Sequence, residues 1–96
     1  MPIVRLIYVS TRSDQINEVE RVWRTECAPL MIKQPGCLSE QLLKCLDTPG
    51  DYISYAEWDS RESIDRYLAS PAHQEIVSHT RQLGTEKPVV KHYQLV

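Results

Sequence analysis

The sequence lacks the features that mark nucleotide-binding, nucleic-acid-binding and membrane-spanning proteins. Its three glycines are isolated from one another, so they form none of the glycine-rich loops that bind the phosphates of nicotinamide, flavin or ATP cofactors. It has no run of Lys or Arg and a formal net charge of −2, which argues against a nucleic-acid partner or an anionic membrane surface. No apolar stretch approaches the roughly 20 residues that span a bilayer.

The N-terminal stretch also lacks the features of a signal peptide. Arg5 interrupts its apolar run and no small-residue cleavage site follows, so residues 3–9 are interpreted as a strand. A cytoplasmic location is the expectation that follows. The 96 residues are 42% hydrophobic and 25% charged, which is typical of a soluble globular protein and predicts one domain over residues 1–96.

Cysteine and histidine are too scattered to predict a metal site. The chain has three cysteines, Cys27, Cys37 and Cys45. Their odd number and the absence of a CxxC pair favour free thiols over a disulfide framework or a zinc site. His73 and His79 are six residues apart, on different faces of a helix, and His92 is alone near the C-terminus. We expect no metal and no cofactor, although His79 or His92 could act as a base if it reached a cavity.

Apolar periodicity predicts strands over residues 3–9, 37–46, 52–58 and 89–96. The first of these is apolar on both of its alternating sets, which suggests burial on both faces. The second has no cleanly defined apolar face, because Glu40 and Lys44 alternate with Leu38 and Leu42. Each strand is bounded by turn residues, such as the Pro49-Gly50 pair before residues 52–58.

Helices are predicted between these strands. The first is expected to be capped by Ser13 or Asp14 and to end at Pro35-Gly36. A second should begin at about Ser60, with Asp59 as its N-cap and Glu62 as the capping-box partner. The last predicted helix has Ser70 as its N-cap, begins at Pro71 and ends at Gly84.

This order of elements is that of the ferredoxin-like β-α-β-β-α-β fold of the α+β class, with helices on one face of an antiparallel four-stranded sheet. The other face would be left uncovered, although the first strand is apolar on both sides. A second copy of the chain is the simplest cover for such a face. We therefore expect a homodimer, with Ile7 and Tyr55 in its interface.

The most specific pattern lies in residues 52–74. A strand ends in Trp58, an acidic turn follows, and an amphipathic helix leads to a Ser-Pro break. In the segments YAEWDS and YLASPAHQ, and in chain length and element order, the sequence resembles the antibiotic biosynthesis monooxygenase family. The resemblance implies a dimeric α+β barrel in which two sheets pair.

The resemblance also implies candidate catalytic residues. In the anthrone-type oxygenases of this family, an active-site Trp corresponds to Trp58, an Asn four residues earlier to Ser54, and a Tyr to Ile64. Positions 54 and 58 share one face of the strand. We take Trp58, as an indole N–H donor, and Ser54 as the candidate catalytic pair, with core or dimer packing as the alternative role of Trp58.

Haem degradation is the other activity that the family suggests. Its members would place an Asn on the first strand, a Trp in the second helix and a His in the third. This chain has Tyr67 and Val77 at the last two positions, His79 lies on a different face, and the only Asn is Asn17 in the first helix. Haem degradation is therefore not expected.

The leading hypothesis is a cofactor-independent monooxygenase that oxidises an aromatic or quinol-like small molecule with O2. Such a substrate supplies its own electrons once it is deprotonated, so no metal is needed. We expect a small, mainly apolar cavity between sheet and helices. The candidate substrate-binding residues are Tyr67, Ile64, His79 and His92. The alternatives are a non-catalytic small-molecule-binding or stress-associated barrel protein and an isomerase of a small metabolite.

Overall fold

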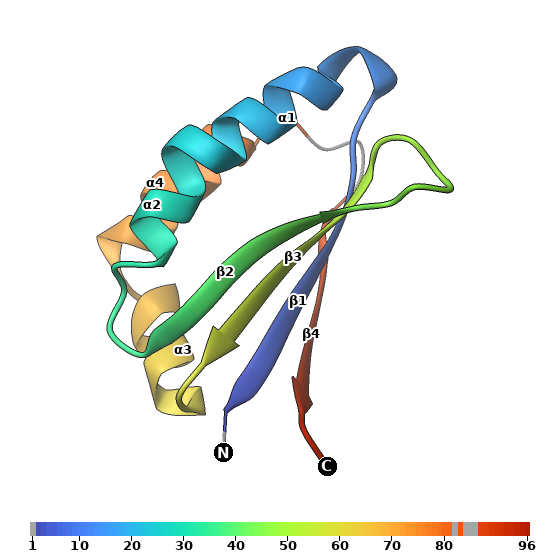
Figure 1. Cartoon of the computed structure of the whole chain (residues 1–96). Coiled ribbons are helices and arrows are strands. Elements are labelled where there is room, and N and C mark those ends of the chain that lie inside the picture. Colours follow the sequence, from blue (N-terminus) through green and yellow to red (C-terminus); the bar gives the residue numbers. More distant parts are fainter. Residues whose placement is uncertain (1, 82, 84–86) are drawn as a thin grey trace.

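The computed structural model describes residues 2–81, 83 and 87–96 of the chain. In chain order its elements are β1 (Ile3–Ser10), the 3-10 turn η1 (Ser13–Gln15), α1 (Ile16–Val22), the π-helical turn η2 (Trp23–Cys27), α2 (Ala28–Met31), β2 (Cys37–Lys44), β3 (Asp51–Trp58), α3 (Arg61–Leu68), α4 (Pro71–Thr80) and β4 (Val89–Gln94). The expected helix end at Gly84 lies outside the described residues. Figure 1 shows a curved sheet with the helices on one side and both termini at one end.

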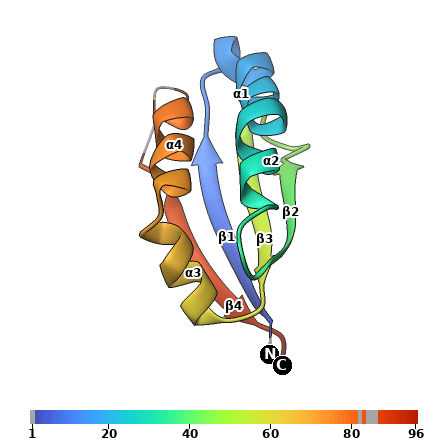
Figure 2. The ribbon, with the colours of Figure 1, turned by 90° about the vertical axis from the view of Figure 1, so that its left-hand side faces the viewer.

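The sheet has the strand order β2-β3-β1-β4, and its three neighbouring pairs are all antiparallel. Figure 2 looks onto the helix-covered face. There α1 and α2 lie in front of β3 and toward β2, α3 and α4 lie toward β4, and β1 is seen between these two pairs of helices. This is the predicted α+β ferredoxin-like fold. The central strand β1 therefore runs along the gap between the two pairs of helices.

The first helix begins differently from the prediction. Its initial 3-10 turn has Arg12 at the N-cap and no side-chain cap, so the expected cap by Ser13 or Asp14 is wrong. Asp14 instead forms an ion pair with Arg12, with Nε 3.3 Å from Oδ1. That pair is exposed, where water already solvates both charges.

A π-helical turn interrupts the same helix at η2. Pro29 follows it closely, and in a regular α-helix the proline ring would clash with the carbonyl of Thr25. The wider turn accommodates this, with the Ala28 N–H bonded to the carbonyl of Trp23, five residues back. Trp23 and Cys27 both line the space between helix and sheet as a result.

A β-bulge sets the orientation of β2. The pairing with β3 shifts between Cys37 and Ser39, so Leu38 is the extra residue. Cys37 faces the helices before the bulge, and Glu40 and Leu42 face them after it. The bulge explains why residues 37–46 show no clean apolar alternation, and it turns the Glu40 carboxyl inward.

The start of α3 is fixed by Ser60, whose Oγ accepts a hydrogen bond from the Ser63 N–H at 3.2 Å. The predicted cap at Asp59 with Glu62 is thus one residue too early. Asp59 instead donates its backbone N–H to the Gly36 carbonyl at 2.8 Å. Gly36 has φ +88° and packs so closely on Ser63 that a Cβ would overlap its side chain.

The start of α4 agrees with the prediction. Ser70 is the N-cap, its Oγ accepts from the His73 N–H at 3.4 Å, and Pro71 is the first helical residue. The Ser70 hydroxyl also donates to the Tyr67 carbonyl at 2.6 Å. This corner therefore fixes Tyr67 and His73 relative to each other, with ring centroids 5.2 Å apart.

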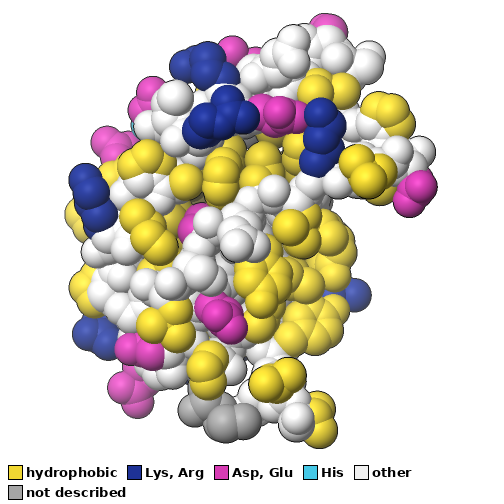
Figure 3. All heavy atoms as spheres, in the orientation of Figure 1, with side chains coloured by type: hydrophobic (Ala, Val, Ile, Leu, Met, Phe, Trp, Pro, Cys, Tyr) yellow, Lys and Arg dark blue, Asp and Glu magenta, His cyan; other side chains and the backbone are white. Residues whose placement is uncertain are grey.

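No element of this chain covers the second face of the sheet among the described residues. Its apolar side chains are Val4, Leu6, Tyr8, Leu43, Ile53, Tyr55, Val89 and Tyr93. Figure 3 shows hydrophobic side chains gathered on the side of the sheet away from the helices. Ile7 is not among them, because it alternates with these residues and points to the helices, so its expected place in an interface is wrong.

The cysteines are free thiols, as predicted. Burial raises the pKa of Cys27 and of Cys37 to about 11, so both are neutral at pH 7 and poor nucleophiles. Within the described residues, no three His, Cys, Asp or Glu side chains are grouped as metal ligands. None of the helices in that part of the chain is both long and apolar enough to cross a bilayer.

Candidate functional site

A cavity of about 410 Å³ lies between the helices and the sheet. Its wall is mainly apolar, and its aliphatic part is contributed by Ile7, Val9, Val19, Leu42, Ile76, Val77, Leu83 and Val90. Ile76, Val77 and Thr80 of α4, with Leu83 beyond its end, line one side of it. The sequence-based expectation of a small, mainly apolar cavity agrees with this geometry.

The polar part of the wall lies along one row of the sheet. Strand pairing places Glu40 and Arg5 on either side of Ala56, with His92 next to Arg5 on the far side. Two buried nitrogens of this row, Arg5 Nε and His92 Nε2, have no hydrogen-bond partner among the described residues. Glu40 Oε2 has no bond of good geometry there either, although the Trp23 indole is near enough to act on the carboxyl. Buried polar atoms are nearly always bonded, so two unpartnered nitrogens in one row indicate a site that a ligand or water completes.

Glu40 is the acid–base group of this row. Its Oε1 accepts a hydrogen bond from the Ser54 hydroxyl at 2.7 Å. Burial raises the pKa of Glu40 to about 7, although the Ser54 hydroxyl, the Trp23 indole and the positive charge of Arg5 all act to lower it. Both protonation states are thus populated near neutral pH, which is the condition for an efficient general base.

Arg5 is the cationic group of this row. Its side chain lines the cavity and the residue is only 6% exposed. Burial lowers the pKa of Arg5, and the hydroxyl of Tyr67 and the carboxylate of Glu40 act to raise it. An arginine does not lose its proton in a protein, so the charge stays. Within residues 2–81, 83 and 87–96, no acidic group is within ion-pair distance of it.

Two of the residues predicted from sequence reach the cavity. Ser54 lines its floor and holds Glu40, and Tyr67 lines it from α3. Burial raises the pKa of Tyr67, so its hydroxyl is a hydrogen-bond donor and not an anion at neutral pH. His73, which the sequence analysis left aside, also lines the cavity, and burial followed by the charge of Arg5 lowers its pKa.

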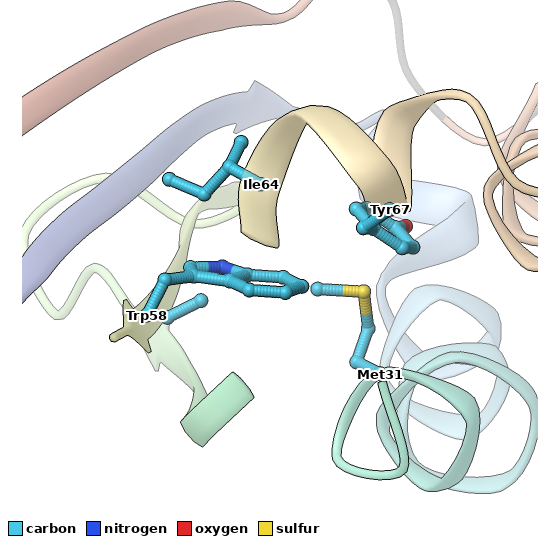
Figure 4. Close-up of a cluster of buried hydrophobic side chains, with 5 residues drawn as sticks. Met31, Trp58, Ile64 and Tyr67 are labelled. Atoms are coloured by element: carbon cyan, nitrogen blue, oxygen red, sulfur yellow. The ribbon is translucent and has the colours of Figure 1, made fainter. Parts of the chain in front are cut away.

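Trp58 and Ile64 lie behind the cavity wall. Both are 0% exposed and belong to a core cluster with Met31, Ala56 and Tyr67. Figure 4 shows the nitrogen-bearing edge of the Trp58 indole turned toward Ile64 and its benzene end toward Met31 and Tyr67. The Trp58 and Tyr67 rings are 5.4 Å apart. Trp58 Nε1 has no hydrogen-bond partner among the described residues, so packing surrounds this N–H without using it.

The two predicted histidines lie apart from each other. His79 is on the helical layer, with Nε2 3.8 Å from a carboxylate oxygen of Glu26. His92 flanks Arg5 on β4, where burial and the neighbouring positive charges lower its pKa. Neither is among the cavity-lining residues, although the buried Nε2 of His92 lies in the polar row.

Sequence reasoning missed the two charged residues of the site, Arg5 and Glu40. A signal for each was present: Arg5 interrupts the apolar set of Ile3, Ile7 and Val9, and Glu40 shares an alternating set with Leu42. A charge inside an apolar alternation is costly if it is buried, and such a residue is a candidate for function. The bulge at Leu38 hid the second signal.

Comparisons with known proteins agree with this fold. Residues 2–78 match the family model described as antibiotic biosynthesis monooxygenase. No curated protein matches the chain in sequence.

Solved structures match it over nearly their whole length. Proteins from Bordetella bronchiseptica (21% identity, TM-score 0.88, 99% of this chain and 97% of that one) and Nitrosomonas europaea (16%, 0.85, 98% and 98%) carry the provisional name of antibiotic biosynthesis monooxygenase. SnoaB, a cofactor-independent oxygenase from Streptomyces nogalater solved as a point variant, matches at 21% identity and TM-score 0.78, over 98% of this chain and 92% of that one. At these identities the likeness establishes the fold alone.

Proposed function

Because the chain belongs to the antibiotic biosynthesis monooxygenase family, we propose that its cavity is the active site of a cofactor-independent monooxygenase acting on a small aromatic or quinol-like substrate with O2. The observation that supports this most strongly is Glu40. A single carboxyl with a pKa of about 7 faces a cavity whose other walls are mainly apolar. That is the group such a reaction needs first, because the substrate reacts with O2 only after it has lost a proton.

The proposed reaction balances without an external reductant. Glu40 takes a proton from a CH2 group beside an aromatic ketone, and the electron pair of the broken C–H bond is delocalised onto the ketone oxygen. O2 then forms a bond to that carbon, which gives a hydroperoxide once a proton is returned. Loss of the second hydrogen breaks the O–O bond, leaving a new carbonyl and one water. All four electrons come from the substrate, and a hydroquinone can be oxidised to a hydroxyquinone with the same stoichiometry.

The other predicted site residues have supporting roles in this proposal. Ser54 is a positioning residue, since its hydroxyl is already donated to Glu40. Tyr67 offers the cavity a neutral O–H donor. Trp58 and Ile64 pack behind Tyr67 in the core cluster. His92 lies next to Arg5 on β4, at the end of the polar row.

Oxygen uptake by metal-stripped protein tests the proposal. With a panel of anthrones and hydroquinones, the wild type should consume O2, and 18O2 should place one labelled atom in the product and one in water. Glu40→Gln keeps the shape and the bond from Ser54 but cannot take the proton, so its turnover should fall by roughly 100- to 10,000-fold. Glu75→Gln, which changes an exposed carboxyl on α4, is the matched control. Absence of uptake by the wild type across the panel would contradict the proposal.

An isomerase is the second candidate, because Glu40 could return the same proton to a different carbon. Exchange of substrate hydrogen for deuterium without O2 consumption, lost in Glu40→Gln, would favour it. A non-catalytic binding protein would show neither uptake nor exchange.

The uncovered sheet face supports a homodimer as the working form. Its side chains include the partly exposed Tyr8 (36%), Leu43 (43%), Tyr93 (45%) and Val89 (51%). A self-complementary apolar face closes as a two-fold pair. Light scattering should give about twice the 11.1 kDa chain mass at micromolar concentration.

A further inference from the structure

The charge of Arg5 is unbalanced in the cavity. Arg5 is only 6% exposed, and its Nε has no partner in the part of the chain that the structure describes. Burying a guanidinium is costly unless a partner of opposite charge accepts its hydrogen bonds. The nearest acidic group facing the same space, Glu40, attracts it without reaching ion-pair distance. Within the described residues, no group bonds to Arg5 Nε and no carboxylate forms an ion pair with this buried cation.

Arg5 and Glu40 are placed so that one ligand group can contact both. The two residues are two strands apart in one row, on either side of Ala56, which makes their backbones roughly 10 Å apart. Both side chains are long and both line the cavity. A group lying between their tips would have the cation on one side and the carboxyl on the other.

The remaining length of the cavity has a different character. Along β1 the wall continues through Ile7 to Val9, roughly 13 Å from Arg5 at the rise of a strand. Val90 lies beside Ile7 in the same row, and Leu42 lies in that row beyond Ser54. A ligand that fits has a charged or strongly polar end at Arg5 and an apolar body over these residues.

We infer that Arg5 is the anion-binding residue of the site, and that the substrate is an aromatic molecule whose oxygen is an anion, or becomes one when Glu40 removes the neighbouring proton. The second half of this inference rests on the proposed function, and the first half does not. The proton goes from the substrate to the Glu40 carboxylate, and the electron pair left behind is held as an enolate or phenolate oxygen facing Arg5. Hydrogen bonds from a guanidinium to such an oxygen strengthen as the charge develops, which lowers the barrier to deprotonation.

A pair of inert probes tests the anion site without any oxygen chemistry. 2-Naphthoate and 2-naphthamide have nearly the same size, differ in charge, and are not expected to react with O2. By titration calorimetry the wild type should bind naphthoate roughly 10- to 100-fold more tightly than the amide. Arg5→Gln should remove this preference and leave the affinity for the amide within about threefold of the wild-type value. Arg5→Lys keeps the charge but not the planar guanidinium that binds a carboxylate with two hydrogen bonds, so it should retain part of the preference.

The matched control is Arg81→Gln. Arg81 follows α4 directly and also lines the cavity, but it is exposed. The preference for naphthoate should survive this change. Its loss in Arg81→Gln, its persistence in Arg5→Gln, or a wild type that binds naphthoate no better than the amide would each overturn the inference.

The two proposals fail in different ways. Anion preference in the wild type without O2 uptake from any anthrone or hydroquinone would leave Arg5 as an anion site and remove the oxygenase. O2 uptake that is lost in Glu40→Gln but unchanged in Arg5→Gln, by a wild type without anion preference, would support the oxygenase and remove Arg5 as an anion site. Circular dichroism and melting curves check that Arg5→Gln and Arg5→Lys are folded before their affinities and turnover are compared with those of the wild type.

Discussion

Replacing Glu40 by Gln should stabilise the folded chain, and the gain should depend on pH. Glu40 carries a pKa of about 7 in the folded chain against 4.5 in the open chain, because burial disfavours its charged form. Below pH 4.5 both states hold the proton and the wild type and Gln variant should be about equally stable. As pH rises from 4.5 to 7 the unfolded chain releases its proton while the folded chain keeps it, so the free energy of unfolding of the wild type falls.

The magnitude follows from the size of the shift. One pKa unit corresponds to about 1.4 kcal/mol, so the wild type should lose about 3 kcal/mol of stability over this range and nothing further above pH 7. The Gln variant has no such penalty and keeps the acceptor oxygen for the Ser54 hydroxyl. At pH 8 it should therefore be more stable than the wild type by about 3 kcal/mol, which is a large part of the 5–15 kcal/mol typical of a domain.

The groups that face Glu40 from the packed elements are Arg5 on β1, Ser54 on β3, Trp23 and Cys27 on η2, Cys37 on β2 and Tyr67 on α3. Arg5 keeps its charge throughout, and the pKa of each of Cys27, Cys37 and Tyr67 is raised, so none of these groups titrates between pH 4 and 8. His73 in the cavity and His92 in the polar row, whose pKa values burial lowers, are present in both proteins. Their contributions cancel in the comparison, so the difference between the wild type and the Gln variant over that range belongs to Glu40.

Urea unfolding at fixed protein concentration, at half-unit steps from pH 4 to 8, measures the difference between the two proteins. The control is Glu75→Gln, which removes a carboxyl from the exposed side of α4. A stability difference that stays flat with pH, or a Gln variant that is less stable at pH 8, would refute the view that Glu40 is buried at a cost.

Three further predictions use the same reasoning. Arg5→Met should raise the melting temperature, since an apolar side chain of similar length replaces an unpaired buried cation, with a gain of about 1–4 kcal/mol; a drop would assign Arg5 a structural role. Trp58→Phe should lower the melting temperature, because the ring is fully buried among Met31, Ile64 and Tyr67, and should change turnover less than Glu40→Gln does; a hundredfold loss of turnover with an unchanged melting temperature would assign the indole N–H a catalytic role. Tyr55→Asp should dissociate or unfold the homodimer by placing a charge on the uncovered face, and a variant that light scattering shows to be an undisturbed dimer would contradict that interface.

The fold followed from the sequence because many weak local signals agree. The short apolar segments of β1 and β3, the Pro71 start of α4 and the turn at Pro49-Gly50 all indicate the same order of elements. Errors occurred where one residue decides the geometry. A cap can move from Asp59 to Ser60 with little change in composition, and only the structure shows which oxygen accepts the bond.

The site was harder to predict because its geometry depends on two irregularities. The bulge at Leu38 reverses the facing of β2 and brings Glu40 inward, and the π-helical turn before Pro29 places Trp23 beside it. Neither leaves a clear pattern in a single sequence, since each is a local departure from the period on which pattern reading rests. The family resemblance pointed to Trp58, which lies one layer behind the cavity wall.

Arg5 and Glu40 together help to separate the candidate functions. A protein that only binds an anionic ligand gains from Arg5 but loses from Glu40, because a carboxylate facing a bound anion repels it. A core under selection for packing alone would carry an apolar residue at both positions. A reaction that creates an anion by removing a proton needs both groups at once, one to take the proton and one to stabilise the charge that remains. Two destabilising residues in one row of a small domain therefore favour proton transfer over binding, whether or not O2 takes part in the step that follows.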